Sequence, residues 1–161
     1  MSHTTKVKSV VIRDVRAIRA AVQELQRAGR KIALKENAIP RMYYKDQFQT
    51  STKRQTAEYV IECQGMSNIT GKPCDVGLVK QDDGTFVPYL DTWGNYVKEH
   101  CGNPKLTAKD GLTESDIAIA AFSQAYSKHA AIFAATDQGY TVQDCYLDSA
   151  GNVQLTVATG F

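Results

Sequence analysis

The chain has 161 residues, of which 43% are hydrophobic and 22% charged, and its formal net charge at pH 7 is +2. This length suits one domain with a single hydrophobic core and is short for two large ones. No segment is apolar for long enough to span a membrane, and the first thirty residues carry charges where a signal peptide needs an apolar centre. We therefore expect residues 1–161 to form one cytoplasmic domain with no membrane partner.

The charges are divided unevenly along the chain. Residues 1–54 hold 13 Lys and Arg against 4 Asp and Glu, whereas residues 55–161 hold 6 basic and 13 acidic residues. This excess predicts a cationic surface from the first third, able to meet a polyanion, and an acidic remainder that limits indiscriminate binding. The alternative is that the two parts interleave in space and neutralise each other.

The first third of the chain has the pattern of a β-α-β unit. Residues 6–14 are rich in β-branched side chains and predict a strand, and Asp14 is a good N-cap for a following helix. Gly29 is placed to end that helix. Its apolar stripe repeats at spacings of three and four, through Val15, Ile18, Val22 and Leu25. Residues 31–35 alternate as a short second strand.

Strands and a turn follow. Three strands are predicted over residues 56–63, 74–80 and 85–90. Asp83-Gly84 is a strong signal for a hairpin turn between the last two, and Pro88 suggests that the last one lies at an edge or bends. Residues 91–111 have the composition of a connecting loop, with Trp93 and Tyr96 expected to anchor it on the body.

The last third predicts one long helix and a hairpin. Thr113 and Asp116 resemble a capping box, and Gly139 closes the helix that begins there. Residues 140–147 and 153–159 form the two strands of the hairpin. The predicted fold is therefore α+β: an antiparallel sheet with two helices packed on it, in the order β-α-β, several strands, long helix and C-terminal β-hairpin.

Several segments in this order resemble a known family. They are "MSHTTKVKSVVIRD", "CDVGLVKQDDGTF" with "DTWG", and "AYSKHAAIFAATDQGYTVQDCYLDSAGNVQLTV". The family has no known function and is found in algal plastid, cyanobacterial and phage genomes. The resemblance covers most of the chain and is weakest over residues 37–55 and 98–112; Thr92 stands where the family often has the first of two tryptophans. It implies no active site, and it allows a phage member that binds nucleic acid in the nucleus-like compartment of large phages, within the host cytoplasm.

The stretch "RMYYKDQFQTSTKRQ", residues 41–55, combines three aromatic rings and four cations with a single carboxylate. Cations that follow phosphates and rings that stack on bases are the ingredients of single-strand binding, where each stacked base contributes about 1–3 kcal/mol. The predicted contacts are Arg41, Tyr43, Tyr44, Lys45, Phe48, Lys53 and Arg54. We expect residues 37–55 to project as a loop or hairpin, because Ile39-Pro40 interrupts regular structure and the polar run offers little to bury.

A second group of cations extends this predicted track. Its members lie in the first strand and on the helix face opposite the apolar stripe: Lys6, Lys8, Arg13, Arg16, Arg19 and Arg27. Together the two groups predict a non-catalytic protein that binds RNA or single-stranded DNA. The alternative is that Tyr44 and Phe48 are ordinary core residues and that the cations form a solvated surface.

Metal binding and catalysis have weaker signals. The candidate ligands Cys63, Cys74, His100 and Cys101 include no Cys-x-x-Cys pair, so we expect no zinc site. Cys63 and Cys145 lie in strand patterns and read as small buried hydrophobes. His100 is adjacent to Cys101, but adjacent side chains on an extended segment point apart. We therefore predict no catalytic residue, metal or cofactor.

Two other classes of function stay open. A protein-interaction or assembly factor, binding a second copy or a phage protein, would use the acidic part and the exposed rings. Its binding would survive neutralisation of the cations. A small-molecule binder or enzyme would present a deep pocket, near Trp93 and His100, with a perturbed titratable group inside it.

Overall fold

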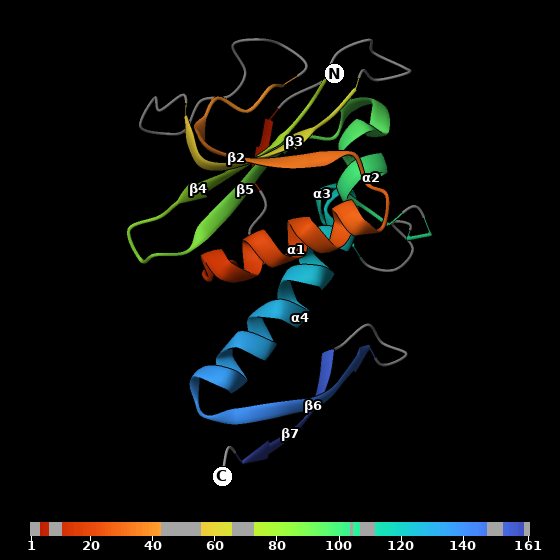
Figure 1. Cartoon of the computed structure of the whole chain (residues 1–161). Helices are drawn as coiled ribbons and strands as arrows, with labels where there is room; N and C mark the ends of the chain where they lie inside the picture. The colour runs from red at the N-terminus through yellow and green to blue at the C-terminus, as the bar shows by residue number, and fades with distance from the viewer. Residues whose placement is uncertain are drawn as a thin grey trace.

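The structure is a computed structural model that describes residues 4–6, 11–42, 56–65, 73–103, 105–106, 112–147 and 153–159. Within these residues a five-stranded antiparallel sheet lies at one end, helices lie beneath it, and a separate two-stranded hairpin lies at the other end (Figure 1). The predicted α+β class is confirmed, including the long helix and the C-terminal hairpin.

The large sheet has the strand order β1-β5-β4-β3-β2, with every neighbouring pair antiparallel. Its strands are β1 (Thr4–Lys6), β2 (Ile32–Ala38), β3 (Ala57–Cys63), β4 (Val76–Lys80) and β5 (Phe86–Asp91). The predicted first strand is shorter than expected, because regular pairing covers only Thr4–Lys6 and Ile12 forms an isolated bridge to Phe86. β2 pairs only with β3 and is therefore an edge of the sheet.

Pro88 lies inside the sheet, in β5, rather than at its edge. The Phe86 N–H donates to the Ile12 carbonyl, so the nitrogen of Pro88, two residues on, faces the same side. On that side of β5, Phe86 pairs with Ile12, and Tyr89–Asp91 pair with β1. Pro88 has no partner there among the described residues. Proline has no backbone N–H, and at Pro88 none is needed, because the position lies between the paired residues on this side of β5.

Helix α1 (Val15–Arg27) forms as the sequence pattern predicts. The Asp14 side chain accepts the Arg16 N–H at 2.9 Å and caps the first turn. Five buried residues at helical spacing face the sheet: Ala17, Ile18, Ala21, Val22 and Leu25. The Tyr126 hydroxyl, from a helix more than 100 residues later, accepts the N–H groups of Arg13 and Asp14 and holds this helix start in place.

The segment over residues 91–111 is not only a loop, which corrects the sequence-based expectation. It contains a 3-10 turn, η1 (Trp93–Asn95), and a short helix, α2 (Tyr96–Cys101). Gly94 and Asn95 both have positive φ and separate the two turns, so the helical residues are too few for a periodic signal. Tyr96 is buried as predicted, while the side chain of Trp93 lies outside the described part of the chain.

The predicted single helix over residues 113–139 is divided into α3 (Glu114–Ala118) and α4 (Ala120–Asp137). The predicted capping box of Thr113 and Asp116 is confirmed at the start of α3. The division lies at Ile119, which is fully buried, so packing overrides the continuous helical pattern there. The described residues therefore contain four α-helices, whereas two were predicted.

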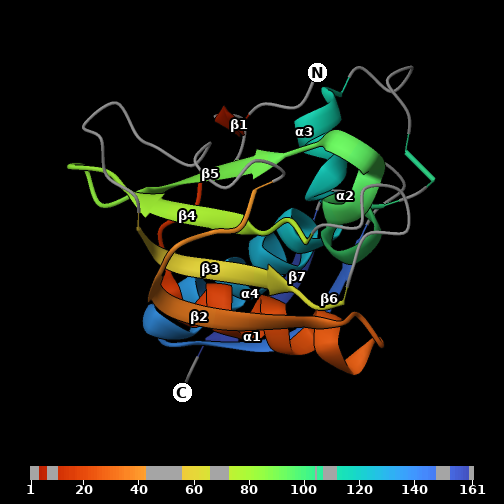
Figure 2. The ribbon, with the colours of Figure 1, turned by 90° about the horizontal axis from the view of Figure 1, so that it is seen from above.

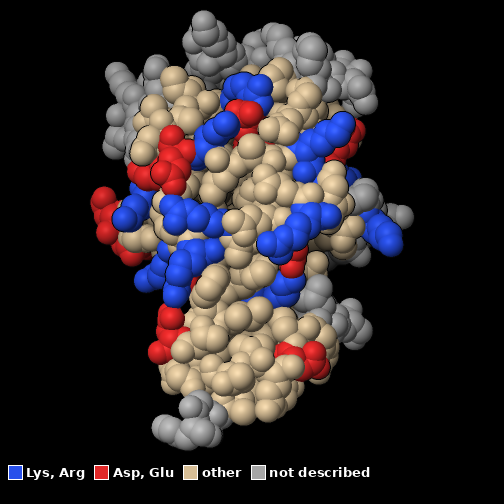
Figure 3. Space-filling model, in the orientation of Figure 1, with Lys and Arg blue, Asp and Glu red and all other residues tan. Residues whose placement is uncertain are grey.

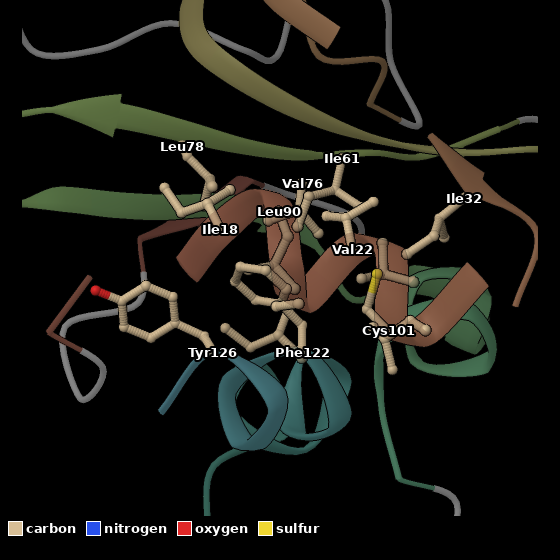
Figure 4. Close-up of a cluster of buried hydrophobic side chains, with 14 of the residues drawn as sticks. Ile18, Val22, Ile32, Ile61, Val76, Leu78, Leu90, Cys101, Phe122 and Tyr126 are labelled. Atoms are coloured by element: carbon tan, nitrogen blue, oxygen red, sulfur yellow. The ribbon is translucent and has the colours of Figure 1, made fainter. Parts of the chain in front are cut away.

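The main core lies between the sheet and the two long helices (Figures 2 and 4). Side chains from α1, four strands, α2 and α4 meet there: Ile18, Val22, Ile32, Ile61, Val76, Leu78, Leu90, Cys101, Phe122 and Tyr126. A small second cluster covers the opposite face of the sheet and comprises Met42, Ala57, Val60 and Val79. The sheet is therefore apolar on both faces near its centre.

Below the core, α4 continues downward and carries the hairpin of β6 (Tyr140–Leu147) and β7 (Val153–Thr159) (Figure 1). This hairpin forms a sheet of its own and does not join the five-stranded one. Its register shifts between Val142 and Asp144, as in a β-bulge.

Truncation of Phe122 tests where the core lies. Phe122 is fully buried between α1 and the sheet, so Phe122→Ala should lower the free energy of unfolding by about 3–5 kcal/mol. Phe133→Ala, on the same helix but only partly buried at the margin of the core, should cost clearly less. Urea denaturation followed by circular dichroism measures both. Equal losses would contradict a core that ends near the middle of α4.

Candidate nucleic-acid interface

The outer face of α1 carries a row of polar and cationic side chains. Arg16, Arg19, Gln23 and Arg27 follow one another at intervals of three and four, opposite the buried stripe, and all four are exposed. The row spans roughly 16 Å at a rise of 1.5 Å per residue. Figure 3 shows Lys and Arg spread across the middle of this side of the molecule. The same helical period therefore produces a core stripe and a cationic row.

Carboxylates lie beside two of these arginines. Arg16 pairs with Asp14 at 2.8 Å and Asp137 at 2.7 Å, and Arg19 pairs with Glu36 at 2.8 Å. The hydrogen bond from Arg16 lowers the pKa of Asp137 below its usual value. Both arginine side chains keep at least half of their surface in water. Such exposed pairs contribute little to stability, so a phosphate can replace the carboxylate at low cost.

Other cations near this row have no carboxylate partner among the described residues. Arg13, Arg27, Lys31 and Lys35 are exposed, and no ion pair is recorded for any of them in the described part of the chain. Lys31 precedes the edge strand β2 and Lys35 lies within it. Lys31 and Lys35 were not among the predicted contacts, although they contributed to the basic excess, because the alternating pattern of residues 31–35 indicated only a strand.

A groove lies between α1 and the edge strand β2. Its volume is about 400 Å³, and it is lined by Arg19, Val22, Gln23, Gln26, Ala33, Leu34 and Glu36. Gln26 donates to the Ile32 carbonyl at 2.9 Å and so ties the helix to the strand. The groove thus holds two side-chain amides and the Arg19–Glu36 pair beside the apolar side chains of Val22, Ala33 and Leu34.

Arg41 occupies a different environment. Its Nε donates to Asp75 Oδ2 at 2.9 Å, one terminal nitrogen donates to Asp75 Oδ1 at 3.0 Å, and its backbone N–H also reaches that carboxylate. The hydrogen bonds with Asp75 raise the pKa of Arg41 above its ordinary value. Asp75 is buried with 1% exposure and accepts the Cys63 N–H as well. Arg41 therefore holds β2, β3 and β4 together and is bound to a buried charge.

Several predicted contacts cannot be placed on this surface. Tyr43, Tyr44, Lys45, Phe48, Lys53, Arg54 and Lys8 lie outside the described residues, and Lys6 is described only as part of β1. Met42, which precedes this stretch, packs with Val60 on the sheet face opposite α1.

The residues weighed for metal binding or catalysis lie close to α2. Cys63, Cys74 and Cys101 are buried free thiols, and the described residues contain no group of three or more His, Cys, Asp or Glu arranged to hold a metal ion. The ring nitrogens of His100 lie 2.9 and 3.0 Å from the carbonyl oxygens of Tyr96 and Gln64, and the nitrogen that carries a hydrogen donates to its carbonyl. His100 is thus a tie between α2 and the end of β3.

A cavity of about 260 Å³ lies beside α2 and α3. It is lined by Thr92, Asn95, Lys98, Leu106, Glu114, Ile117 and Ala118. Its lining holds one cation and one carboxylate, and His100 is not part of it. It gives no specific reason to prefer a small-molecule binder over the basic surface.

The chain matches no protein-family model, no curated protein and no solved structure. The resemblance to the plastid, cyanobacterial and phage family therefore stays a prediction. Within the described residues, no helix has the length and apolar character that crossing a bilayer requires.

Removal of the Asp75 charge tests the structural role of Arg41. Asp75→Asn leaves the Arg41 guanidinium without its carboxylate, and we expect a loss of about 3 kcal/mol in the free energy of unfolding. This is the low end of the range for buried pairs because Arg41 is partly in water. Asp137→Asn, which removes an exposed carboxylate from Arg16, is the matched control and should change stability little. Similar urea midpoints for both variants would contradict this role.

Thiol labelling tests the placement of the cysteines. Burial raises the pKa of Cys74 to about 12, and the hydrogen bond with Cys101, together with burial, raises the pKa of Cys63 well above its usual value. Few thiolates therefore exist at about pH 8, where a free cysteine reacts readily. We expect a disulfide reagent to label the partly exposed Cys145 first and the other three only as the protein unfolds. Rapid reaction of all four thiols in the folded protein would contradict this order.

Proposed function

We propose that the protein binds RNA or single-stranded nucleic acid, without catalysis, on the face formed by the outer row of α1 and the edge strand β2. The observation that carries the proposal is the presence of three exposed cations, Arg27, Lys31 and Lys35, that have no carboxylate partner among the described residues, next to the exposed pairs of Arg16 and Arg19. Residues 13–38 hold seven cations and three acidic residues, so this surface keeps a positive excess. Adding Asp137, the acidic residue from the second part of the chain that pairs with Arg16, gives seven cations against four acidic residues and leaves an excess of three.

Binding would begin with the phosphates. The free cations take phosphate oxygens and release counterions, which is the main source of affinity in this class of complex. Arg16 and Arg19 exchange their surface carboxylates for phosphates as the strand settles along the helix. Gln23 and Gln26 carry side-chain amides in the α1–β2 groove, where they can hydrogen-bond sugar or base edges.

Aromatic stacking is the second part of the proposal. Tyr43, Tyr44 and Phe48 supply rings, and Lys45, Lys53 and Arg54 supply further charge, in the part of the chain that the structure does not describe. Arg41 is not proposed as a phosphate ligand, because its guanidinium is held by Asp75. We include in this proposal that the chain is a phage member of the resembled family and acts in the host cytoplasm. The support for this part is the order of the sequence motifs.

Charge removal on this face tests the proposal. In Arg27→Ala/Lys31→Ala/Lys35→Ala, binding of labelled single-stranded RNA should weaken because three phosphate contacts are lost. The slope of log affinity against log salt should fall by about 2, since each contact on a single strand contributes roughly 0.7. Fluorescence anisotropy at several salt concentrations, repeated with matched single-stranded DNA and duplex, measures both quantities.

The matched control is Lys80→Ala/Lys98→Ala/Lys105→Ala, which removes the same charge from other parts of the molecule. It should leave the salt slope near that of the unmodified protein. Equal losses in the two variants would show a net-charge effect and no defined interface. An absence of binding at low salt would overturn the proposed function altogether.

A further inference from the structure

The end of the chain forms a lobe that the main core does not include. This C-terminal lobe comprises residues 127–147 and 153–159: the last eleven residues of α4 and the hairpin of β6 and β7. None of its side chains that the structure describes is buried, and of these side chains only Ala130 and Phe133 of α4 pack against the margin of the main core. Figure 1 shows it projecting away from the large sheet, with the hairpin lying against α4.

The hairpin is amphipathic. The register places Val142 opposite Val157 and Cys145 opposite Leu155, so these four side chains share one face with Tyr140 and Val153. The other face carries mainly polar residues: Thr141, Asp144, Tyr146, Gln154, Thr156 and Ala158. A strand pattern of this kind is typical of a sheet with one buried face.

That apolar face is covered incompletely. Tyr140 is 39% exposed and Val157 is 40% exposed, although both lie on the face that the pattern marks for burial. Among the described helices, α4 is the one that packs extensively against the hairpin, and its neighbouring turns carry mainly small alanine side chains. Tyr140 and Val157 thus expose apolar surface to water on an element outside the main core, and contiguous exposed apolar surface can mark an interaction site.

The charge of the lobe restricts what can bind there. Residues 130–161 contain no Lys, Arg or His and only three Asp. Figure 3 shows Lys and Arg across the middle of the molecule and none on the visible side of its lower end. Of the described acids, Asp137 is paired with Arg16 and Asp144 lies on the polar face of the hairpin. Lys128 and His129, at the start of the lobe, lie beside Glu24 of α1, and the rest of the lobe has no cation, so it does not suit nucleic acid or an anionic membrane.

We propose that this lobe is the interface between two copies of the chain, related by a two-fold axis. A nearly uncharged surface is compatible with itself, since self-pairing brings no set of like charges together. Both strands of the hairpin pair only with each other among the described residues, so their outer edges can accept a second hairpin. A two-stranded sheet is marginal in water, and pairing with its copy supplies the further strands and apolar cover.

The size of the lobe fits such an interface. The hairpin offers eight residues from β6 and seven from β7, to which α4 adds those of its last eleven residues that do not contact α1 or the core, against the roughly 20–30 residues per partner of a typical stable interface. The cationic row on α1 lies outside it, so each copy in the pair keeps its own basic face. Two linked faces on one nucleic-acid strand would raise the overall affinity by avidity.

The oligomeric state of the full chain tests the interface. Sedimentation equilibrium at micromolar concentrations should give twice the chain mass of 17.7 kDa, and this mass should persist in about 1 M NaCl because the contact is apolar. Nucleic-acid binding, in contrast, should be lost at that salt concentration. Failure of one property therefore does not imply failure of the other.

Substitutions on the two faces of the hairpin provide the matched comparison. Val157→Asp places a charge on the apolar face and should yield the single-chain mass, and Val142→Asp, opposite it in the register, should do the same. Thr141→Asp adds the same charge on the polar face, opposite Ala158, and should keep the doubled mass. All three sites are outside the buried core, so circular dichroism should show folded protein. A single-chain mass for the unmodified protein, an open-ended increase with concentration, or equal effects on both faces would overturn the proposal.

Discussion

The buried carboxylate of Asp75 is the constraint on which the arrangement of the sheet depends. It accepts hydrogen bonds from the Arg41 side chain and backbone and from the Cys63 N–H, so it joins the end of β2, the end of β3 and the start of β4. The Tyr96 hydroxyl donates to the Cys63 carbonyl at the same place and fixes α2 there. A buried charge is tolerated only when its hydrogen bonds are complete, so these segments must keep their relative positions.

The helices then take their places on this frame. α1 turns its apolar stripe to the sheet, and α4 adds Phe122 beneath it, while the Tyr126 hydroxyl accepts two backbone N–H groups at the start of α1. Arg16 lies over the Phe133 ring at 4.7 Å and strengthens the contact between the two helices. Because one face of α1 is buried, its arginines are necessarily presented outward, and the fold itself creates the cationic row.

The molecule thus has two surfaces with different physics. The basic face of α1 and β2 depends on charge, and its binding should weaken as salt screens phosphates. The C-terminal lobe is nearly uncharged, and its association should depend on apolar burial, which salt does not screen. In a two-fold pair, contact between the C-terminal lobes would hold the two basic faces at a fixed distance and orientation. The two proposals are separate, and together they describe a binder whose copies act jointly on one strand.

The sequence by itself determined the local structure: the Asp14 cap and stripe of α1, the capping box at Thr113, the β2 to β5 strands, the final hairpin and the uneven charge. These features follow from neighbours in the chain. It could not show that Arg41 is held by a carboxylate 34 residues away, that Arg16 meets Asp137, or that α2 forms after Asn95. Nor could it show that the hairpin stays apart from the main sheet. These depend on contacts between distant segments, which only the tertiary structure decides because packing and burial choose each partner.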